Sequence, residues 1–374
     1  MVYDYVVIGS GLSGLTIATA LSQETSKVLL LDSADQAGGW LRKLHMPFVP
    51  ATPSALSAVQ NLESLLNLKI LGEVRDSNPV TYENSSLKTF MGFGEKSPDF
   101  YDEISYYCAP QSYDLKLTPS EWISLLIERF KGTFQPRSIV TKFVVENGRV
   151  QSLLVNGTKK IVGHNFIFCG EMKSLEILLP LDFMSSKARN KIAKTKTWTR
   201  ASLQLTHAEP VTENKDFHIL IGTAADEIVT CVGRFVGQVS TWTTFVSDDE
   251  AEDPEVTAQA LKRIKRQIKR AYPESLNTPL EEKIVVQSEF GGHFDVKLQA
   301  NQTWPEIENL WIGSSSVQKD RNLVGALRQA WLVLASLGFG ISASSSFETA
   351  GTTEDTFADL ELALETSEKK EAEL

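Results

Sequence analysis

The sequence predicts an α/β protein in which a doubly wound parallel sheet is combined with a second domain built on an antiparallel sheet. Three observations favour this fold. The first forty residues read as strand, glycine-rich turn, helix and strand. Residues 198–246 alternate apolar and polar side chains in runs separated by turns. An apolar strand and a helical stretch return after residue 308, which makes the first domain discontinuous. A chain of 374 residues, 42% of them apolar, can form both domains.

The first strand is followed by the pattern of a nucleotide-binding turn. Residues 6–8 are apolar, as in a strand buried on both faces, and Gly9, Gly11 and Gly14 follow with GxGxxG spacing. Gly9 permits a tight turn, Gly11 lets the backbone approach a pyrophosphate, and Gly14 lets the helix pack against the strand, whereas an ordinary glycine turn is the alternative. Free amides at the helix start would hold the phosphates. We therefore expect the whole loop to bind an adenine dinucleotide: Gly9, Ser10, Gly11, Leu12, Ser13 and Gly14.

An acidic residue stands where a dinucleotide-binding domain needs one. The second apolar strand ends in Asp32, eighteen residues beyond Gly14. An acid at this position binds a ribose hydroxyl in doubly wound, Rossmann-like domains. We expect Asp32 and its neighbour Ser33 to lie at the ribose; a solvated acid at a strand end is the alternative.

A second glycine pair follows six residues after the acid. Gly38 and Gly39 precede Trp40, Leu41 and Arg42. Together with GSGLSG and the acid, this run resembles the amino-terminal signature of FAD-dependent amine oxidases and protoporphyrinogen oxidases. The resemblance implies that FAD is the cofactor and that residues 38–42 lie along its diphosphate and flavin edge. Glycine amides and a guanidinium suit a dianionic diphosphate, although a loop turn with a surface arginine would read the same way.

The resemblance implies further FAD contacts later in the chain. Val140, in the run V-T-K-F, stands in the place of a valine whose backbone meets the adenine, although such a residue can also belong only to the core. The late strand and the helix after it imply contacts from Gly313, Ser314 and Gly325, with a helix N-terminus facing the flavin. The family commonly has Ser-Gly where this chain has Gln329-Ala330, followed by Trp331. This departure predicts less room for the flavin.

His293 is the candidate catalytic residue. It follows Gly291 and Gly292 in a segment that resembles the one before the last flavin contacts of protoporphyrinogen oxidases. The alternative is a hydrogen-bonded structural histidine. No other acid, base or nucleophile constellation stands out, and hydride transfer to flavin does not require one.

Local patterns predict several other elements. Ser54 is expected to cap a leucine-rich helix. Thr118 and Glu121 have the spacing of a capping box. Two Asn-Gly dipeptides, at residues 147–148 and 156–157, predict hairpins. The runs LKTFMGF and ISYYCAP are expected to be strands of an inserted antiparallel element.

These elements divide into two domains and a tail. The FAD-binding domain is expected to comprise residues 1–73, 118–180 and 300–345, and the α+β substrate domain residues 74–117 and 181–299. The tail, residues 346–374, lacks a core-forming pattern. Of the net charge of −10, a net −7 lies between Glu348 and Leu374, where nine acids face two lysines.

Composition excludes several classes of protein. Basic and aromatic residues do not cluster as they do in nucleic-acid-binding proteins, and no apolar run is long enough to span a membrane comfortably. The first strand begins within a few residues of Met1, so we expect no signal peptide and a cytoplasmic location. Cys108, Cys169 and Cys231 lack metal-ligand spacing, so we expect reduced thiols and no metal site.

The sequence therefore predicts an FAD-dependent oxidoreductase with a small-molecule substrate. Hydride would come from an amine, a saturated carbon–carbon bond or a reduced ring, and oxygen or a quinone would reoxidise the flavin. No second GxGxxG exists for a nicotinamide cofactor. Two alternatives are a flavoenzyme without net redox change, because the start of the chain also resembles UDP-galactopyranose mutases, and a non-catalytic binding protein of the same fold, as Rab GDP-dissociation inhibitors are.

Overall fold

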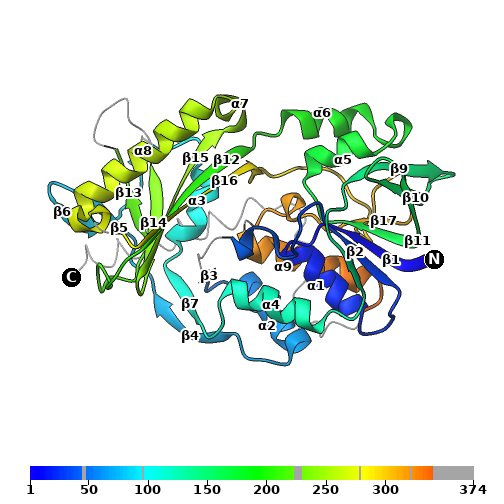
Figure 1. Ribbon diagram of the computed structural model, residues 1–374, viewed down its shortest axis with the longest axis horizontal. Coiled ribbons are helices and arrows are strands. Elements are labelled where there is room, and N and C mark those ends of the chain that lie inside the picture. The colour runs from blue at the N-terminus through cyan, green and yellow to red at the C-terminus, as the bar shows by residue number, and fades with distance from the viewer. Residues whose placement is uncertain (44–47, 95–96, 223–229, 278, 321, 340–374) are drawn as a thin grey trace, which may run out of the picture. The chain divides into compact units, whose positions relative to one another are not determined.

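The described part of the chain builds two seven-stranded sheets and one three-stranded sheet (Figure 1). A computed structural model describes residues 1–43, 48–94, 97–222, 230–277, 279–320 and 322–339. The expected tail lies outside these residues. None of the helices within them is long and apolar enough to cross a membrane.

The first large sheet is the predicted doubly wound sheet. Its strand order is β8-β2-β1-β11-β10-β9, and β17 pairs with β11. The strands are β1 (Val2–Ile8), β2 (Val28–Leu31), β8 (Thr133–Gln135), β9 (Val140–Glu146), β10 (Arg149–Val155), β11 (Lys159–Phe168) and β17 (Leu310–Ile312). All pairs are parallel except those that β10 makes with β9 and β11. Since β1 lies at the centre, Val6 and Val7 are fully buried, and the turn after β1 opens at the carboxyl edge of the sheet.

Four helices pack beside the first sheet (Figure 1). They are α1 (Leu12–Leu21), α2 (Pro53–Leu66), α4 (Pro119–Arg129) and α9 (Asn322–Ser336). Helix α1 contacts β1, β2, α4 and α9, and each residue of α1 is buried. This explains why α1 carries no polar face: it is enclosed by the sheet on one side and by helices on the others.

The second large sheet is almost entirely antiparallel. Its order is β16-β12-β15-β14-β13-β5-β6, with a single parallel contact between β13 and β5. The strands are β5 (Val80–Glu83), β6 (Ser86–Thr89), β12 (Trp198–Thr206), β13 (His218–Leu220), β14 (Cys231–Val236), β15 (Val239–Ser247) and β16 (Glu281–Phe290). Helix α8 (Pro254–Ala271) covers one face with Ile264 and Ile268, while its lysines and arginines turn away from the core.

The small sheet and the short helices connect these two parts. The sheet consists of β3 (Val49–Pro50), β7 (Gln111–Leu115) and β4 (Leu71–Asp76). The short helices are α3 (Tyr101–Ser105), α5 (Met172–Leu178), α6 (Ser186–Lys194) and α7 (Asp248–Ala251), with 3-10 turns at Gly39–Arg42, Tyr106–Cys108, Leu181–Phe183, Pro273–Leu276 and Ser315–Val317. The doubly wound α/β fold with a second antiparallel sheet is therefore confirmed.

Two local predictions are wrong. The run ISYYCAP is not a strand, because Ile104 and Tyr107 belong to α3 and the 3-10 turn after it and pack their side chains into an aromatic core. The cap of α2 is Thr52 rather than Ser54: its Oγ1 accepts a hydrogen bond from Ala55 N at 3.2 Å, and Pro53 then occupies the first helical position.

Other local predictions are confirmed. Thr118 and Glu121 form the reciprocal capping box at α4. Both Asn-Gly turns join antiparallel strands, with φ near +50° at Asn147 and Asn156. Cys108, Cys169 and Cys231 are free.

Candidate active site

The glycine turn after β1 leaves a space beside its backbone. Gly9 has φ of +98°, and a Cβ there would lie 3.0 Å from Cys169 O. A Cβ at Gly14 would lie 1.9 Å from Gly9 O, so close packing of α1 on the turn requires glycine. Gly11 differs from both, because a Cβ there would meet no atom of the described residues within 4 Å. Steric contacts within the protein therefore require glycine at positions 9 and 14, whereas Gly11 borders open space.

Helix α1 presents free amides to that space. Its N-cap is Gly11, which makes no side-chain capping bond, and the first four N–H groups of a helix have no partner within it. Ser13 does not cap them, because its Oγ donates to Gly313 O at 2.6 Å and ties α1 to the residue after β17. The N-terminus of α1 thus offers donors and a partial positive charge to an anion.

Asp32 is bound to the glycine turn. Its Oδ2 accepts hydrogen bonds from Ser10 N at 2.6 Å and Ser10 Oγ at 2.5 Å, and its Oδ1 accepts one from Ala34 N at 2.8 Å. A carboxylate has roughly four acceptor sites, so one remains for a ribose hydroxyl. Ser33 is exposed and lies beside it in the chain. The predicted ribose contact is compatible with this geometry and stays a prediction.

The second glycine pair lies against the first loop. Gly38 and Gly39 have φ of +118° and +55°, and a Cβ at Gly39 would be 3.2 Å from Gly11 Cα. Gly38 N also donates to Ser10 O at 2.9 Å. Arg42 turns back on its own loop, where Nη1 donates to Ala37 O at 3.1 Å. The two glycine loops therefore form one backbone surface, and Arg42 stabilises the second loop through its hydrogen bond to Ala37.

Gly313, Ser314 and Gly325, the predicted cofactor contacts late in the chain, allow close packing or cap a turn. A Cβ at Gly313 would meet Cys169 Sγ at 2.5 Å, and one at Gly325 would meet Asp320 O at 2.1 Å, so both glycines allow close packing. Ser314 caps the 3-10 turn Ser315–Val317 by accepting a hydrogen bond from Ser316 N. Gln329 and Trp331, the larger residues that depart from the family pattern, have partners away from the glycine loops. Trp331 Nε1 donates to Ala58 O in α2, and Gln329 Nε2 donates to Ile312 O. They take no room at the loops.

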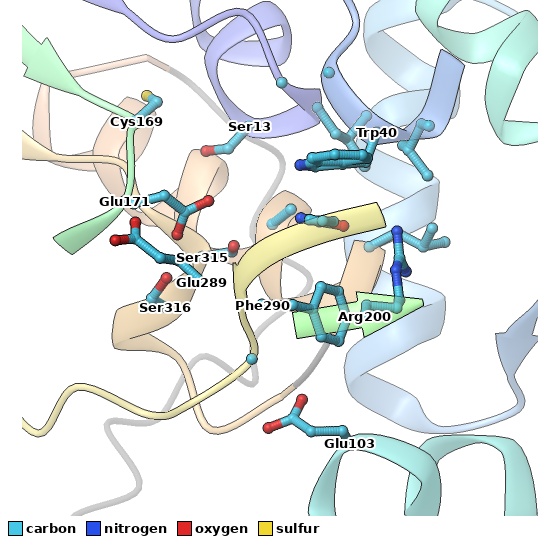
Figure 2. Close-up of a pocket in the computed structure, with 18 of the residues that line it drawn as sticks. Ser13, Trp40, Glu103, Cys169, Glu171, Arg200, Glu289, Phe290, Ser315 and Ser316 are labelled. Atoms are coloured by element: carbon cyan, nitrogen blue, oxygen red, sulfur yellow. The ribbon is translucent and has the colours of Figure 1, made fainter. Parts of the chain in front are cut away.

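A cavity of about 250 Å³ begins at these loops and ends at the second sheet. The glycine turn and α1 form one wall through Gly11, Leu12, Ser13 and Gly14, and the second pair adds Gly38, Gly39, Trp40 and Leu41. Other lining residues come from α3, β12, β16 and the segments after β11 and β17; among them are Glu103, Tyr107, Glu171, Arg200, Gln287, Glu289, Phe290, Ser315 and Ser316. Figure 2 shows several of these side chains converging on the cavity.

Two carboxylates stand together on one side of the cavity. Figure 2 shows Glu171, from the segment after β11, facing Glu289 of β16. Burial, together with the smaller effect of the negative charges of Glu289 and Asp248, raises the pKa of Glu171 to about 7. Glu289 has φ of +54°, a conformation that few non-glycine residues adopt. Glu171 can therefore gain and lose a proton near neutral pH.

A third carboxylate supports the wall. Glu103 of α3 is buried, and its Oε1 accepts a hydrogen bond from Gly292 N at 3.0 Å. A Cβ at Gly291 would lie 2.3 Å from the Glu103 carboxyl carbon. Gly291 and Gly292 therefore let the chain pass close to Glu103 as it leaves β16.

Sequence reasoning missed the residues of the substrate side. Glu103, Glu171, Arg200 and Gln287 belong to no motif, and the topology alone brings them together. Gly291 and Gly292, which have positive φ, lie close to these residues in the structure. In the sequence, this glycine pair points only to its neighbour His293.

Several predicted residues do not line this cavity; they are Gly9, Ser10, Asp32, Ser33, Arg42, Val140, His293, Gly313, Ser314 and Gly325. His293 lines a separate depression beside α6 together with Lys191 and Asp295, and its Nδ1 is 3.2 Å from Gln318 O. Val140 pairs with Val155 in the first sheet and packs against the core. Arg42 is held by its own loop. The structure does not bring His293 together with the glycine loops, so the function proposed below assigns it no catalytic role.

Comparisons with known proteins agree with this geometry. Residues 7–53 match the family described as NAD(P)-binding Rossmann-like domain. No curated protein matches the chain. Among solved structures, the chain is similar to an oxidoreductase from Methanosarcina mazei, with a TM-score of 0.63 at 11% identity over 88% of this chain and 99% of that one.

Two further solved structures carry the names of oxidases. Cyclohexylamine oxidase from Brevibacterium oxydans has a TM-score of 0.60, and a protein named as a protoporphyrinogen oxidase from Exiguobacterium has 0.59; both are 11% identical, and each match covers 90% of this chain and 99% of the other. The chain has the two-domain fold of these oxidases. This confirms, at the level of the fold, the resemblance that the amino-terminal signature indicated.

The residues present fit an adenine dinucleotide. The open space at Gly11, the uncapped amides of α1 and the adjoining second glycine loop form a cradle that no side chain of the described residues fills. Such a cradle suits a diphosphate, because backbone N–H groups can approach it without steric hindrance. The cavity then leads from this cradle to the second sheet.

Proposed function

We propose that this protein is an FAD-dependent oxidoreductase that accepts hydride from an amine, a saturated carbon–carbon bond or a reduced ring of a small substrate, with oxygen or a quinone as the final acceptor. The observation that carries the proposal is the cavity that joins the two glycine loops to the second sheet. A cofactor held by the loops would place its reactive end in the same space as the substrate. The fold shared with named oxidases supports the proposal.

The glycine loops would hold the cofactor. Amides of Leu12, Ser13 and Gly14 would bind the diphosphate, and Asp32 would bind the ribose with its remaining acceptor site. When bound, FAD supplies a two-electron acceptor, while the protein supplies binding and orientation.

The other side of the cavity would hold and prepare the substrate. Phe48, Tyr106, Tyr107 and Phe290 line it with aromatic surface that excludes water. Glu171 lies at this cavity with its pKa raised to about 7, so it can take a proton from a substrate ammonium or return one at neutral pH. The two carboxylates of Glu171 and Glu289 also attract a cationic amine.

The proposal is tested by the cofactor content of the protein and of a Gly11→Ala variant. Gly11 has φ of −65°, which alanine adopts freely, and the added methyl meets no protein atom. The variant should therefore fold, but its methyl would occupy the space where the diphosphate approaches. We expect the wild type to show a flavin absorbance spectrum and to release FAD, and the variant to lose about tenfold or more in FAD affinity, since a misplaced methyl costs about 1 to 3 kcal/mol.

A Ser124→Ala variant, at an exposed position of α4, provides the matched control and should bind FAD like the wild type. Melting curves would show that all three proteins are folded. The proposal fails if the purified wild type is colourless and remains so after incubation with FAD.

A further inference from the structure

Arg200 stands at the end of the cavity formed by the second sheet. It lies on β12, where its backbone pairs with Gln287 of β16 and Phe245 of β15. The residue is 9% exposed and lines the cavity. Figure 2 shows its side chain beside Phe290, away from the carboxylates of Glu171 and Glu289.

The guanidinium of Arg200 lacks the partners that a buried charge requires. Its Nε makes no hydrogen bond, and among the described residues Arg200 has neither an ion pair nor a side-chain hydrogen bond. The Arg200 guanidinium stacks on the Phe290 ring, with its carbon 4.4 Å from the centre of that ring. Burial lowers the pKa of Arg200, although the nearby Tyr107 opposes this effect. A buried cation in this state is costly unless an anion completes its surroundings.

The neighbouring strand shows the same deficit. Gln287, the partner of Arg200 in the β12–β16 pair, is buried and lines the cavity, and its Oε1 has no hydrogen-bond partner. Glu103, another acid of the cavity wall, accepts a hydrogen bond from Gly292 N. Unsatisfied polar groups on two adjacent strands, both facing one cavity, indicate a ligand that satisfies them.

We propose that Arg200 binds a carboxylate of the substrate, an inference that rests on the proposed oxidoreductase function and narrows its substrate class. The planar guanidinium matches the two oxygens of a carboxylate in a bidentate pair, and the enclosed site strengthens that pair. The substrate is then oriented along the cavity. Its anionic end lies at Arg200, away from the carboxylates of Glu171 and Glu289, which repel an anion, and the end to be oxidised points toward the glycine loops.

Binding of three carboxylates and of their uncharged amides tests this inference. The probes are acetate, hexanoate and benzoate, each compared with acetamide, hexanamide or benzamide, on the protein with its bound cofactor. Binding is followed by flavin difference absorbance and, independently, by tryptophan fluorescence, because Trp40 lines the cavity. We expect at least one carboxylate to bind more tightly than its amide. Arg200→Met should weaken that carboxylate about tenfold to a hundredfold, as expected for loss of a charge-assisted hydrogen bond, and leave the amide unchanged.

Two further variants keep the test specific. Arg234→Met removes a guanidinium of the same sheet that stacks on Phe217 and does not line the cavity, so it should not change carboxylate affinity. Arg200→Lys keeps the charge but loses the planar pair of N–H donors of a guanidinium. Its carboxylate affinity should therefore lie between those of the wild type and Arg200→Met.

The possible outcomes separate this inference from the proposed function. Equal binding of acid and amide by the wild type, or equal carboxylate affinity in Arg200→Met, would overturn it. Loss of FAD from Arg200→Met would also overturn it, because Arg200 would then serve the cofactor. A wild type without FAD refutes the proposed function, whereas the fluorescence titration still reports whether Arg200 selects a carboxylate.

Discussion

At the scale of single residues, the cavity separates two kinds of charge. Glu171 and Glu289 lie on one side, and Arg200 lies beside Phe290 on the other. Burial raises the pKa of a carboxyl, and like charges held close to it add to the effect; the raised pKa of Glu171 is the result. The same crowding must weaken the folded protein when Glu171 is ionised, because the negative charge interacts unfavourably with Glu289 and Asp248.

The pKa of Glu171 predicts a pH dependence of stability. Its ordinary value is 4.5 and its value in the folded protein about 7, so between these values the folded state holds the proton more tightly than the unfolded state does. The contribution to stability is therefore complete below pH 4.5 and is lost as the pH rises through 7. Relative to the wild type, Glu171→Gln should gain about 1 to 3 kcal/mol in free energy of unfolding between acid and alkaline pH. Urea unfolding at a series of pH values measures this.

A control acid separates Glu171 from general effects of pH. Glu128 is exposed on α4, so Glu128→Gln should follow the wild-type profile. If the profiles of the wild type and Glu171→Gln run parallel from pH 5 to 8.5, Glu171 does not titrate as described.

At the scale of elements, two kinds of local signal predict the structure correctly. The capping box at Thr118 and both Asn-Gly turns involve only neighbouring residues. Ile104 and Tyr107 show the opposite case: their β-prone run became helical because the side chains pack into an aromatic core built from distant segments. The N-cap of α2 was predicted two residues too late. Thr52, followed by Pro53 at the first helical position, caps the helix in place of Ser54.

The reassigned cap of α2 gives a prediction at this scale. Thr52→Ala removes the acceptor for Ala55 N and should lower the free energy of unfolding by about 1 kcal/mol. Ser54→Ala is the matched control, because its hydroxyl contacts only the Thr52 hydroxyl at 3.3 Å, and should change stability by a few tenths of a kcal/mol. Chemical denaturation of both variants measures the difference. A larger loss for Ser54→Ala than for Thr52→Ala would restore the original assignment.

At the scale of the whole molecule, the sequence predicts one half of the site and not the other. The cofactor half lies in a continuous segment, where Gly11 and Gly39 belong to motifs that a reader of the sequence can recognise. The other half, which we propose binds the substrate, is assembled by topology: Glu103, Glu171 and Arg200 are far apart in the sequence and line the same cavity as the glycine loops. No spacing rule connects them.

The two halves share one cavity, so a ligand that fills the cofactor half should stabilise the folded chain by mass action. A ligand that binds only the folded state adds about 2.7 kcal/mol at a hundred times its dissociation constant. We expect the melting temperature to rise with the logarithm of FAD concentration. ADP, which carries the diphosphate without the flavin, should give a smaller rise because it reaches only the glycine loops. Gly11→Ala should need about tenfold or more of either ligand to reach the same rise, since its methyl stands at the shared diphosphate position. Equal responses of the wild type and Gly11→Ala would show that the nucleotide binds elsewhere, and the assignment of the glycine loops would then be lost.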